Sequence, residues 1–350
     1  IDVSILERNP QVLKPLDRLM ARMIEEHMQS KGVGVYLSRQ IDRVRSSPSD
    51  AINSQAKITG LELDNDLTLD CDLLIVAAGV RPRTELAAQA GLALGRNRGV
   101  LVNEYMQTSD PNIYAVGDIV ELRHGVTGTL ERIPLAGPAN RAGRIAGEHA
   151  ATGRSQPMGN ILGSAIVRVF DLTAACTGWN EAYLVANSID HRSVIIQAAH
   201  HASYYPGAES MQLKLIYEPG TGRILGAQAV GGEGVDKRID VIATAIQFKA
   251  TVMDLAQVDL VYAPPYGSAK DPIHQAAFTA INDLQQSPAM VPPDIDLHAM
   301  QVVDVRTRKE QSDLPLDVPA AAIPVDEVID RYRELDPSQP TAVICHSGKR

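Results

Sequence analysis

The end of the chain carries a cysteine in a loop that is suited to sulfur chemistry. Cys345 follows the apolar run Ala-Val-Ile and begins the pattern Cys-x-x-Gly-x-Arg, which ends at Arg350. A strand that feeds such a loop directs backbone N–H groups and one guanidinium group toward the sulfur. These positive surroundings lower a thiol pKa from about 8.5 and stabilise a bound persulfide. A lone cysteine at a strand end is usually a core thiol, but the six-residue loop favours a catalytic role for Cys345 and Arg350.

A second candidate is Asp118, at the end of the run Thr-Ser-Asp-Pro-Asn-Ile-Tyr-Ala-Val-Gly-Asp. This run predicts a polar turn and then a short buried strand over residues 113–116. Gly117 would let a ligand approach the backbone, and Asp118 would stand at the carboxyl end of the strand, where open α/β sheets bind ligands. An aspartate there can accept a hydrogen bond from a sugar or ribityl hydroxyl. These residues alone leave open the alternative that Asp118 caps the next helix.

Two further stretches would frame this site. Residues 73–76, Leu-Leu-Ile-Val, predict a buried strand that ends at Ala-Ala-Gly-Val-Arg-Pro, where Gly79 and its small neighbours allow a close backbone approach. Residues 133–141 lead into a helix that is rich in Ala and Gly and runs through Ala150. The N–H groups at the start of a helix suit a partial negative charge, although taken alone this is an ordinary interdomain helix. The candidate residues around this helix start are Pro134, Leu135, Ala136 and Asn140.

The first 36 residues predict a strand, a loop, a helix and a strand, which is half of a βαβ sheet. Apolar residues recur at helical spacing from Leu16 to His27, between strand-like runs at residues 3–6 and 32–36. Glu7 would lie at the carboxyl end of the first strand, where a Rossmann domain places the acid that bonds the adenosine ribose. The Gly-x-Gly-x-x-Gly that should precede it by about 20 residues is not in this chain. A solvated acid is therefore the alternative for Glu7.

These stretches resemble the pyridine nucleotide-disulfide oxidoreductases. The run that ends at Asp118 is similar to the second flavin-binding motif of that family, whose matching aspartate holds the FAD ribityl chain. The run that ends at Pro82 resembles the segment where the nicotinamide domain returns to the flavin domain, although Arg83 stands where many relatives carry Asn. The helix after residue 133 resembles the one whose N-terminus faces the flavin pyrimidine edge. The resemblance implies FAD and NAD(P)H as cofactors, with NADH and NADPH both open.

From Ile166 to about Leu284 the pattern changes to strands followed by helices, which predicts an antiparallel sheet with helices on one face. Residues 218–222, Glu-Pro-Gly-Thr-Gly, predict a hairpin turn. This α+β region resembles the dimerisation domain of the same oxidoreductases and implies a homodimer. The predicted strands are 166–170, 194–197, 211–217 and 224–230, and the predicted helices are 236–249 and 271–283.

Two tyrosine-bearing loops narrow the family. Residues 203–207 and 261–272 resemble the coenzyme A-disulfide reductase and NAD(P)H persulfide or polysulfide reductase branch, in which tyrosines from these segments reach the partner's active site. A phenol near a nascent thiolate or persulfide can donate a hydrogen bond and then a proton. Proline-flanked tyrosines are also often loop anchors, and at least two of the four fit that alternative. The four are Tyr204, Tyr205, Tyr262 and Tyr266.

The last part of the chain follows a Pro-rich, semi-rigid linker. Residues 301–310, which include Asp304-Val-Arg306, and the loop that starts at Cys345 resemble the first half of a rhodanese domain. The family's usual His-Ile-Pro-Gly-Ala segment is replaced by Leu-Asp-Val-Pro-Ala at residues 316–320. The resemblance implies a sulfur-carrying module of atypical sequence.

Composition excludes several classes of partner. The 42 acidic and 33 basic residues leave a formal charge of -9 without a basic stripe, which argues against nucleic acids and anionic membranes. No apolar run approaches the length of a membrane span. The three cysteines are odd in number and form no CxxC pair, so we expect no disulfide framework, no metal site and a reducing, cytoplasmic location. Cys71 is expected to be a packed or incidental thiol, and Cys176 is expected to pack within the antiparallel sheet.

The predicted fold class is α/β, with partial FAD- and NAD(P)-binding Rossmann-like domains, an α+β dimerisation domain and a partial rhodanese α/β domain. The predicted function is FAD-dependent reduction, by NAD(P)H, of a small-molecule substrate: coenzyme A disulfide, a persulfide or a polysulfide. The alternatives are an NADH oxidase of the same fold and a non-catalytic dimerisation unit. The predicted boundaries are 1–80 for the NAD(P)H domain, 81–158 for the FAD domain, 159–285 for dimerisation, 286–298 for the linker and 299–350 for rhodanese.

Both ends of the chain interrupt predicted elements. Ile1 leads directly into a strand-like run, and Arg350 stands just after the candidate loop. We therefore interpret the chain as an internal part of a longer protein. In the resembling family the redox cysteine and the first dinucleotide fingerprint lie in an N-terminal flavin segment, which would precede Ile1.

Overall fold

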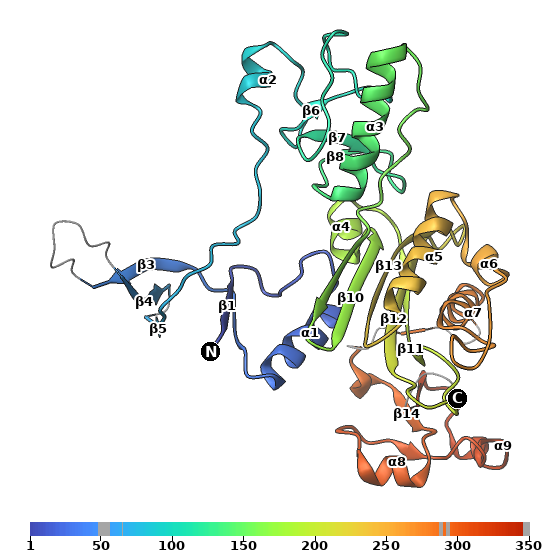
Figure 1. Ribbon diagram of the computed structural model, residues 1–350. Coiled ribbons are helices and arrows are strands. Elements are labelled where there is room, and N and C mark those ends of the chain that lie inside the picture. The colour runs from blue at the N-terminus through green and yellow to red at the C-terminus, as the bar shows by residue number, and fades with distance from the viewer. Residues whose placement is uncertain (48–56, 65, 287–289, 292–294, 346–350) are drawn as a thin grey trace. The chain divides into compact units, whose positions relative to one another are not determined.

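The computed structural model describes the chain except for residues 48–56, 65, 287–289, 292–294 and 346–350 (Figure 1). Its described residues form both helices and sheets, as expected for the α/β class. The chain divides into two compact units. The first comprises residues 1–189, 225–230 and 235–249, and the second comprises residues 190–224, 231–234 and 250–350.

The first unit begins with the predicted strand, helix and strand. Strands β1 (Ser4–Glu7) and β2 (Gly34–Leu37) pair in parallel, and helix α1 (Arg18–Ser30) connects them. The buried face of α1 includes Met20 and Ile24, which pack in a core with Cys176 and Val230. The βαβ prediction is confirmed.

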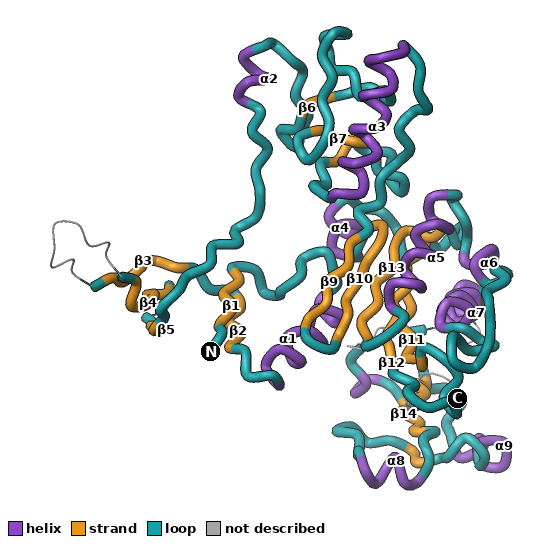
Figure 2. Tube along the Cα trace, in the orientation of Figure 1, coloured by secondary structure: helices purple, strands orange, loops and turns teal. Residues whose placement is uncertain are grey.

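An antiparallel meander follows, but the buried strand expected at residues 73–76 does not form. The meander consists of β3 (Ile41–Ser46), β4 (Ile58–Leu63) and β5 (Thr68–Asp70). Residues 73–84 form neither helix nor strand and appear as a long loop before α2 (Glu85–Gln89) (Figure 2).

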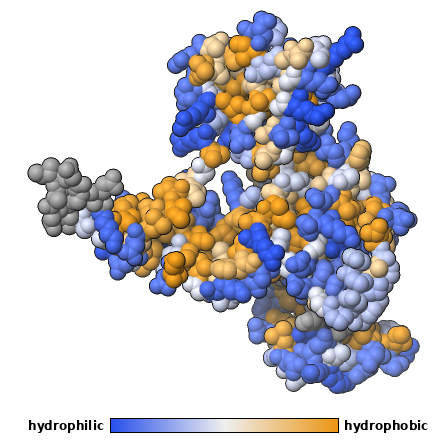
Figure 3. Space-filling view, viewed as in Figure 1, coloured by the Kyte–Doolittle hydropathy of each residue, from blue (hydrophilic) through white to orange (hydrophobic). Residues whose placement is uncertain are grey.

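The apolar residues of this loop are exposed. Leu73, Ile75 and Val76 are 74%, 79% and 76% exposed. Hydrophobic residues gather over the meander and the segment that follows it (Figure 3). A strand of a parallel sheet is buried only between neighbouring strands, and none of the described strands pairs with residues 73–76. The prediction of a buried strand was therefore wrong.

The next part of the first unit is a small sheet with a helix. Strand β7 (Val120–Arg123) pairs in parallel with β6 (Val100–Leu101) and in antiparallel with β8 (Leu130–Glu131). The predicted Ala- and Gly-rich helix is confirmed as α3 (Ala136–Thr152), which packs Ala142 and Ala146 against Val120 and Leu122 of β7.

The prediction of a buried strand at residues 113–116 was wrong. Tyr114 makes only an isolated bridge with Gln107, and Ile113 and Val116 are 37% and 38% exposed. Gly117 and Asp118 therefore do not end a strand but lie in the turn that leads into β7. The position of Asp118 at the carboxyl end of a buried strand is corrected accordingly.

The remainder of the first unit contains β9 (Ala165–Val169) and β10 (Leu172–Gly178), which pair in antiparallel. It also contains α4 (Glu181–Ala186), α5 (Val235–Gln247) and residues 225–230 of β13 (Ile224–Gly231). Strand β10 was not predicted as an element, but Cys176 is buried within it, as expected. Burial raises the pKa of the Cys176 thiol to about 11.

The second unit contains an antiparallel pair, β11 (Arg192–Ala199) and β12 (Ser210–Tyr217). The predicted turn follows β12, where the N–H of Gly222 donates to the carbonyl of Glu218 at 2.8 Å. Helix α6 (Val252–Leu255) packs on α7 (Pro272–Leu284), which lies on both strands. The helices predicted at 236–249 and 271–283 are confirmed as α5 and α7.

A buried carboxylate ties the end of α7 to the sheet and to the next segment. Asp283 is 1% exposed and accepts the Tyr217 phenol at 2.6 Å and Nη2 of Arg192 at 2.9 Å. Oδ1 of Asp283 also accepts a hydrogen bond from the backbone N–H of Met290, at 2.9 Å. Met290 is therefore held beside the C-terminal end of α7.

The end of the chain forms a small parallel sheet with helices. The strand order is β15 (Ala321–Ala322), β14 (Gln301–Asp304) and β16 (Thr341–Ile344). Val303, Val305 and Ile323 form its core, against which Cys345 packs. The short helices of this module are η1 (Leu297–Ala299), α8 (Arg308–Asp313), α9 (Val328–Arg331) and η2 (Tyr332–Glu334). Among the helices of the described residues, none combines the length and apolar character needed to cross a bilayer.

Candidate functional site

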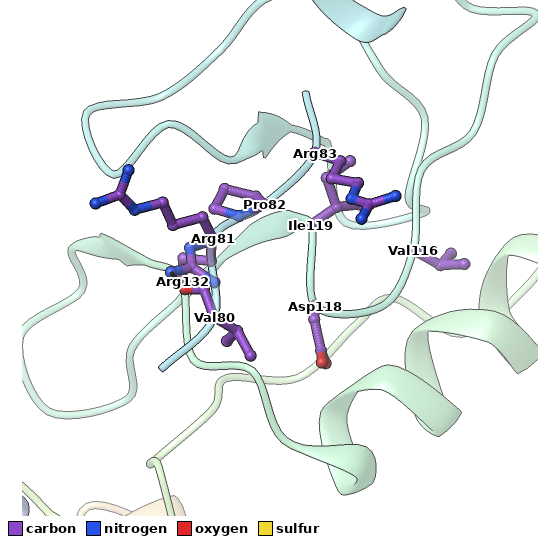
Figure 4. A pocket seen from close by; sticks show the side chains of 8 residues that line it. All are labelled: Val80, Arg81, Pro82, Arg83, Val116, Asp118, Ile119 and Arg132. Carbon is purple, nitrogen blue, oxygen red and sulfur yellow. Dashed lines mark hydrogen bonds between the residues drawn. The ribbon is translucent and has the colours of Figure 1, made fainter. Parts of the chain in front are cut away.

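Two of the segments that were expected to frame a cofactor site meet at one open pocket of the first unit. Residues 80–83 come from the loop before α2, and residues 116–119 come from the turn before β7 (Figure 4). The pocket has a volume of about 340 Å³. It is lined by Val80, Arg81, Pro82, Arg83, Val116, Asp118, Ile119 and Arg132.

Asp118 is the acidic side chain of this lining. It is exposed, and its carboxylate makes no hydrogen bond or ion pair with another described residue. The alternative of a helix cap is excluded, because the turn at Asp118 leads into strand β7 and not into a helix. The carboxylate is thus available to accept a hydrogen bond from a ligand hydroxyl.

Gly117 and Gly79 have backbone conformations that explain their residue type. Their φ angles are +86° and +83°, in the region that side chains other than glycine rarely adopt. A Cβ built at either position would meet nothing within 4 Å. Glycine is therefore required at these two positions by backbone geometry, and the space in front of each remains open to a ligand.

Three arginines give the pocket its positive character. Arg81 and Arg83 flank Pro82, and their guanidinium groups extend in opposite directions (Figure 4). Nη2 of Arg132 lies 3.4 Å from the carbonyl oxygen of Val80, and its Nε is buried without a hydrogen-bond partner among the described residues. None of these arginines was predicted as a site residue. Two features of the sequence could have indicated them. One is the Arg-Pro-Arg run in the segment that resembles the return from the nicotinamide domain to the flavin domain, and the other is the position of Arg132 two residues before Pro134.

The N-terminus of helix α3 has no side-chain cap. Leu135 is its N-cap, with extended backbone and no side-chain cap, so the first N–H groups of the helix are not engaged by a capping side chain. No acidic residue lies in the first turn of the helix. The predicted residues Pro134, Leu135, Ala136 and Asn140 do not line the pocket of Asp118.

Glu7 ends strand β1, at the position that was predicted for a ribose-binding acid. Its Oε1 accepts the backbone N–H of Asn9 at 2.8 Å and the Asn9 side-chain amide at 2.6 Å. Part of the carboxylate is thus used in a local turn. Glu7 does not line the pocket of Asp118, and its role toward NAD(P)H stays a prediction.

The structure brings two of the four predicted tyrosines together. The phenol oxygens of Tyr204 and Tyr262 are 3.3 Å apart, and both side chains are exposed. The two loops are also joined by a hydrogen bond from the N–H of Ala202 to the carbonyl of Gly267, at 2.9 Å. Tyr205 packs edge-on against His201 instead.

The predicted sulfur-carrying loop is described only at its first residue. Cys345 follows β16, as predicted, and is partly buried. Arg350 and the rest of the loop lie outside the described residues. The upstream Asp304 and Arg306 form a buried ion pair with Nη2 to Oδ2 at 2.8 Å. This ion pair lowers the pKa of Asp304 and fixes the segment after β14, which is a structural role.

Comparison with known proteins identifies the family. A model described as pyridine nucleotide-disulphide oxidoreductase matches residues 1–143, and the model of the dimerisation domain of the same oxidoreductases matches residues 164–272. The chain belongs to this family. Enzymes of the family use FAD and NAD(P)H. The predicted mixed α/β fold with FAD/NAD-binding and dimerisation domains is confirmed, and the rhodanese domain stays a prediction.

Individual relatives agree with this assignment. The solved structure of reduced CoADR-RHD from Bacillus anthracis is 38% identical with a TM-score of 0.89, and the alignment covers 99% of this chain and 61% of that one. An NAD-dependent persulfide reductase from A. fulgidus is 36% identical with a TM-score of 0.89, over 99% of this chain and 62% of that one. An NADH oxidase of Methanocaldococcus jannaschii is 36% identical over 290 residues, which are 81% of this chain and 61% of the relative. The chain spans about three fifths of the length of these proteins.

Proposed function

We propose that the complete protein is an FAD-dependent enzyme that uses NAD(P)H to reduce coenzyme A disulfide, a persulfide or a polysulfide. The observation that carries this proposal is the pocket in which Asp118 meets residues 80–83, within the part of the chain that matches the family model. The names of the relatives support the substrate class, since they include a persulfide reductase and coenzyme A disulfide reductases.

The residues of the pocket fit the proposed cofactor. Asp118 would accept a hydrogen bond from a ribityl hydroxyl, and the unpartnered Nε of Arg132 would donate to an acceptor on the same ligand. The start of helix α3 offers backbone N–H groups to a partial negative charge. When bound, FAD supplies the two-electron redox chemistry between NAD(P)H and sulfur.

The tyrosine pair would serve the sulfur substrate. A phenol donates a hydrogen bond to a nascent thiolate and can then transfer its proton from the hydroxyl oxygen. Tyr204 and Tyr262 are the pair that the structure favours for this role, because their hydroxyl groups are in contact and accessible. Tyr205, which packs edge-on against His201, fits the role of a loop anchor better. Tyr266 is 72% exposed, and its role stays a prediction.

The complete protein would act as a homodimer through the region that matches the dimerisation model, residues 164–272. Most oligomers of one chain are two-fold symmetric, so each active site would receive tyrosines from the partner. Sedimentation of the complete protein should show a dimer at micromolar concentration, and a monomer alone would contradict the dimer.

The C-terminal module would carry sulfur on Cys345 as a rhodanese domain.

The decisive experiment measures flavin binding by Asp118 variants of the complete protein. A hydrogen bond to a charged group contributes about 1.5–3 kcal/mol, so Asp118→Ala should weaken FAD binding by about 10-fold or more. Glu104→Ala is a control, because Glu104 is an exposed carboxylate in the same region that does not line the pocket. Equal flavin content in the Asp118 variant and the wild type would contradict the assigned site.

Turnover distinguishes the proposed activity from the alternative of an NADH oxidase, which the relative of M. jannaschii favours. The complete protein should consume NAD(P)H faster with coenzyme A disulfide or a persulfide than with oxygen alone. Oxygen-dependent consumption that is unaffected by these substrates would favour the oxidase. A protein that binds no flavin would favour a dimerisation unit without catalysis.

A further inference from the structure

Arg132 has two different environments within one guanidinium group. Nη2 faces the carbonyl oxygen of Val80 at 3.4 Å, a long distance for a hydrogen bond. Nε is buried and has no partner among the described residues. A buried N–H without an acceptor is costly, so this position favours a ligand that brings an acceptor.

The charges of the pocket indicate what kind of acceptor this is. The lining contains three arginines, Arg81, Arg83 and Arg132, and one carboxylate, Asp118. It therefore has an excess of positive charge. Guanidinium groups bind phosphate oxygens with strong, charge-assisted hydrogen bonds. The pocket therefore fits an anionic phosphate group next to a hydroxyl-bearing chain, which is the chemistry of a dinucleotide.

The segment that Arg132 contacts has little structure of its own. Residues 73–84 form neither helix nor strand, and Val80 is 63% exposed. The free-energy difference between the ordered and the open state of such a segment is small. One additional contact can therefore change its order measurably. Arg132 comes from the loop between β8 and α3, and thus joins this segment to the sheet that carries Asp118.

We propose that Arg132 binds the diphosphate of FAD through Nε and, with Nη2, couples this binding to the docking of residues 73–84. The inference rests on the proposed function and assigns Arg132 as a residue that binds the cofactor in that site. A diphosphate is common to FAD and NAD(P)H, but Asp118 in the same lining favours the ligand that also presents a ribityl chain. Because linkage is reciprocal, FAD should order the segment as much as the ordered segment favours FAD.

The first test compares flavins that differ in phosphate content. Apoprotein of the complete wild type and of Arg132→Gln is titrated with FAD, with riboflavin and with NADH. We expect the Kd for FAD to rise by about 10-fold or more in the variant. The Kd values for riboflavin, which has no phosphate, and for NADH should stay unchanged.

A matched variant controls for the loss of an arginine. Arg123 lies in the adjacent strand β7, is exposed, donates from Nη1 to the carbonyl of Gly128 at 2.6 Å and does not line the pocket. Arg123→Gln should bind FAD as the wild type does. Arg132→Lys, which retains the charge but offers a single nitrogen, should lie between the wild type and Arg132→Gln. It keeps the test informative if the glutamine variant does not fold.

The second test follows hydrogen exchange of peptides from residues 73–84, with and without FAD. The wild type should exchange more slowly with FAD, and this protection should be smaller in the Arg132 variants. Wild-type affinity for FAD in both Arg132 variants would overturn the inference while leaving the proposed function intact. An equal loss of riboflavin binding, or a loss for NADH instead of FAD, would also overturn it. Absence of FAD binding by the wild type would overturn the proposed function as well.

Discussion

The phenol oxygens of Tyr204 and Tyr262 lie 3.3 Å apart although 58 positions separate the two residues in the chain. The hydrogen bond with Tyr204 raises the pKa of Tyr262 above its usual value. Tyr262 thus keeps its proton to a higher pH than an isolated tyrosine. A pair of this kind holds one phenol ready as a proton donor.

Removal of one hydroxyl should change the alkaline side of the activity profile. In Tyr204→Phe, the pKa of Tyr262 should fall, because the bond that raises it is lost. The decline of the rate of disulfide or persulfide reduction at alkaline pH should therefore begin at a lower pH than in the wild type. Tyr332→Phe, which removes an exposed phenol of the C-terminal module, is the control. An identical profile in Tyr204→Phe would show that the pair does not serve the reaction.

The thiol of Cys176 should be unreactive in the folded protein. Burial raises its pKa to about 11, so at pH 8 almost no thiolate is present. Alkylation with iodoacetamide, followed by peptide mass spectrometry, should label Cys71, which is partly exposed, well before Cys176. Equal labelling rates would mean that strand β10 opens readily or that Cys176 is activated.

His124 should make the protein less stable toward acid. Its side chain is fully buried and stacks on Trp179, with ring centroids 4.0 Å apart. Burial lowers its pKa from 6.5 to about 4. Folding therefore favours the neutral form of His124. The contribution of this neutral side chain to stability is fully present above pH 6.5 and is lost as the pH falls toward 4. One pKa unit corresponds to about 1.4 kcal/mol, so the loss reaches about 3 kcal/mol.

A neutral replacement should remove this pH dependence. In His124→Gln, the thermal midpoint should vary less between pH 6.5 and pH 4 than in the wild type, whatever its value at neutral pH. His298→Gln, at an exposed position of η1, is the control. The same decline in the wild type and in His124→Gln would assign the acid sensitivity to other groups.

Cys345 should separate two activities of the complete protein. If it carries a persulfide, Cys345→Ser should abolish transfer of sulfur from thiosulfate to an acceptor while NAD(P)H-dependent disulfide reduction remains largely intact. The physical reason is that a serine hydroxyl is not acidic enough to take up the sulfur at neutral pH. Cys71→Ser should leave both activities unchanged. Retained sulfur transfer in Cys345→Ser would exclude the role, and loss of both activities would show that the two parts are not separable.

Local patterns predicted the elements that are stabilised by their own neighbours in sequence. The helical spacing of α1 and α7, the turn after β12 and the parallel pair β1 and β2 could all be derived from short-range signals. Residues 73–76 and 113–116 have equally apolar runs, but neither is a strand. Whether such a run becomes a strand depends on the presence of strands on either side, which periodicity does not contain.

The candidate site followed the same division. Asp118 and Gly79 were predicted from residue type and motif, because each satisfies a local requirement of charge or backbone conformation. Arg132 was missed, because its importance arises from a contact with Val80, 52 positions away. The pairing of Tyr204 with Tyr262 could likewise not be derived from two separate loops.

The hydrogen bond from Met290 to Asp283 has a consequence for the reach of the C-terminal module. The segment between this anchor and η1 consists of residues 291–296. Six residues of fully extended chain span at most about 20 Å. Cys345 is therefore confined to a small volume around the end of α7, in which its local concentration is of millimolar order. Any sulfur that it delivers within its own assembly should move at a rate that does not change when the protein is diluted.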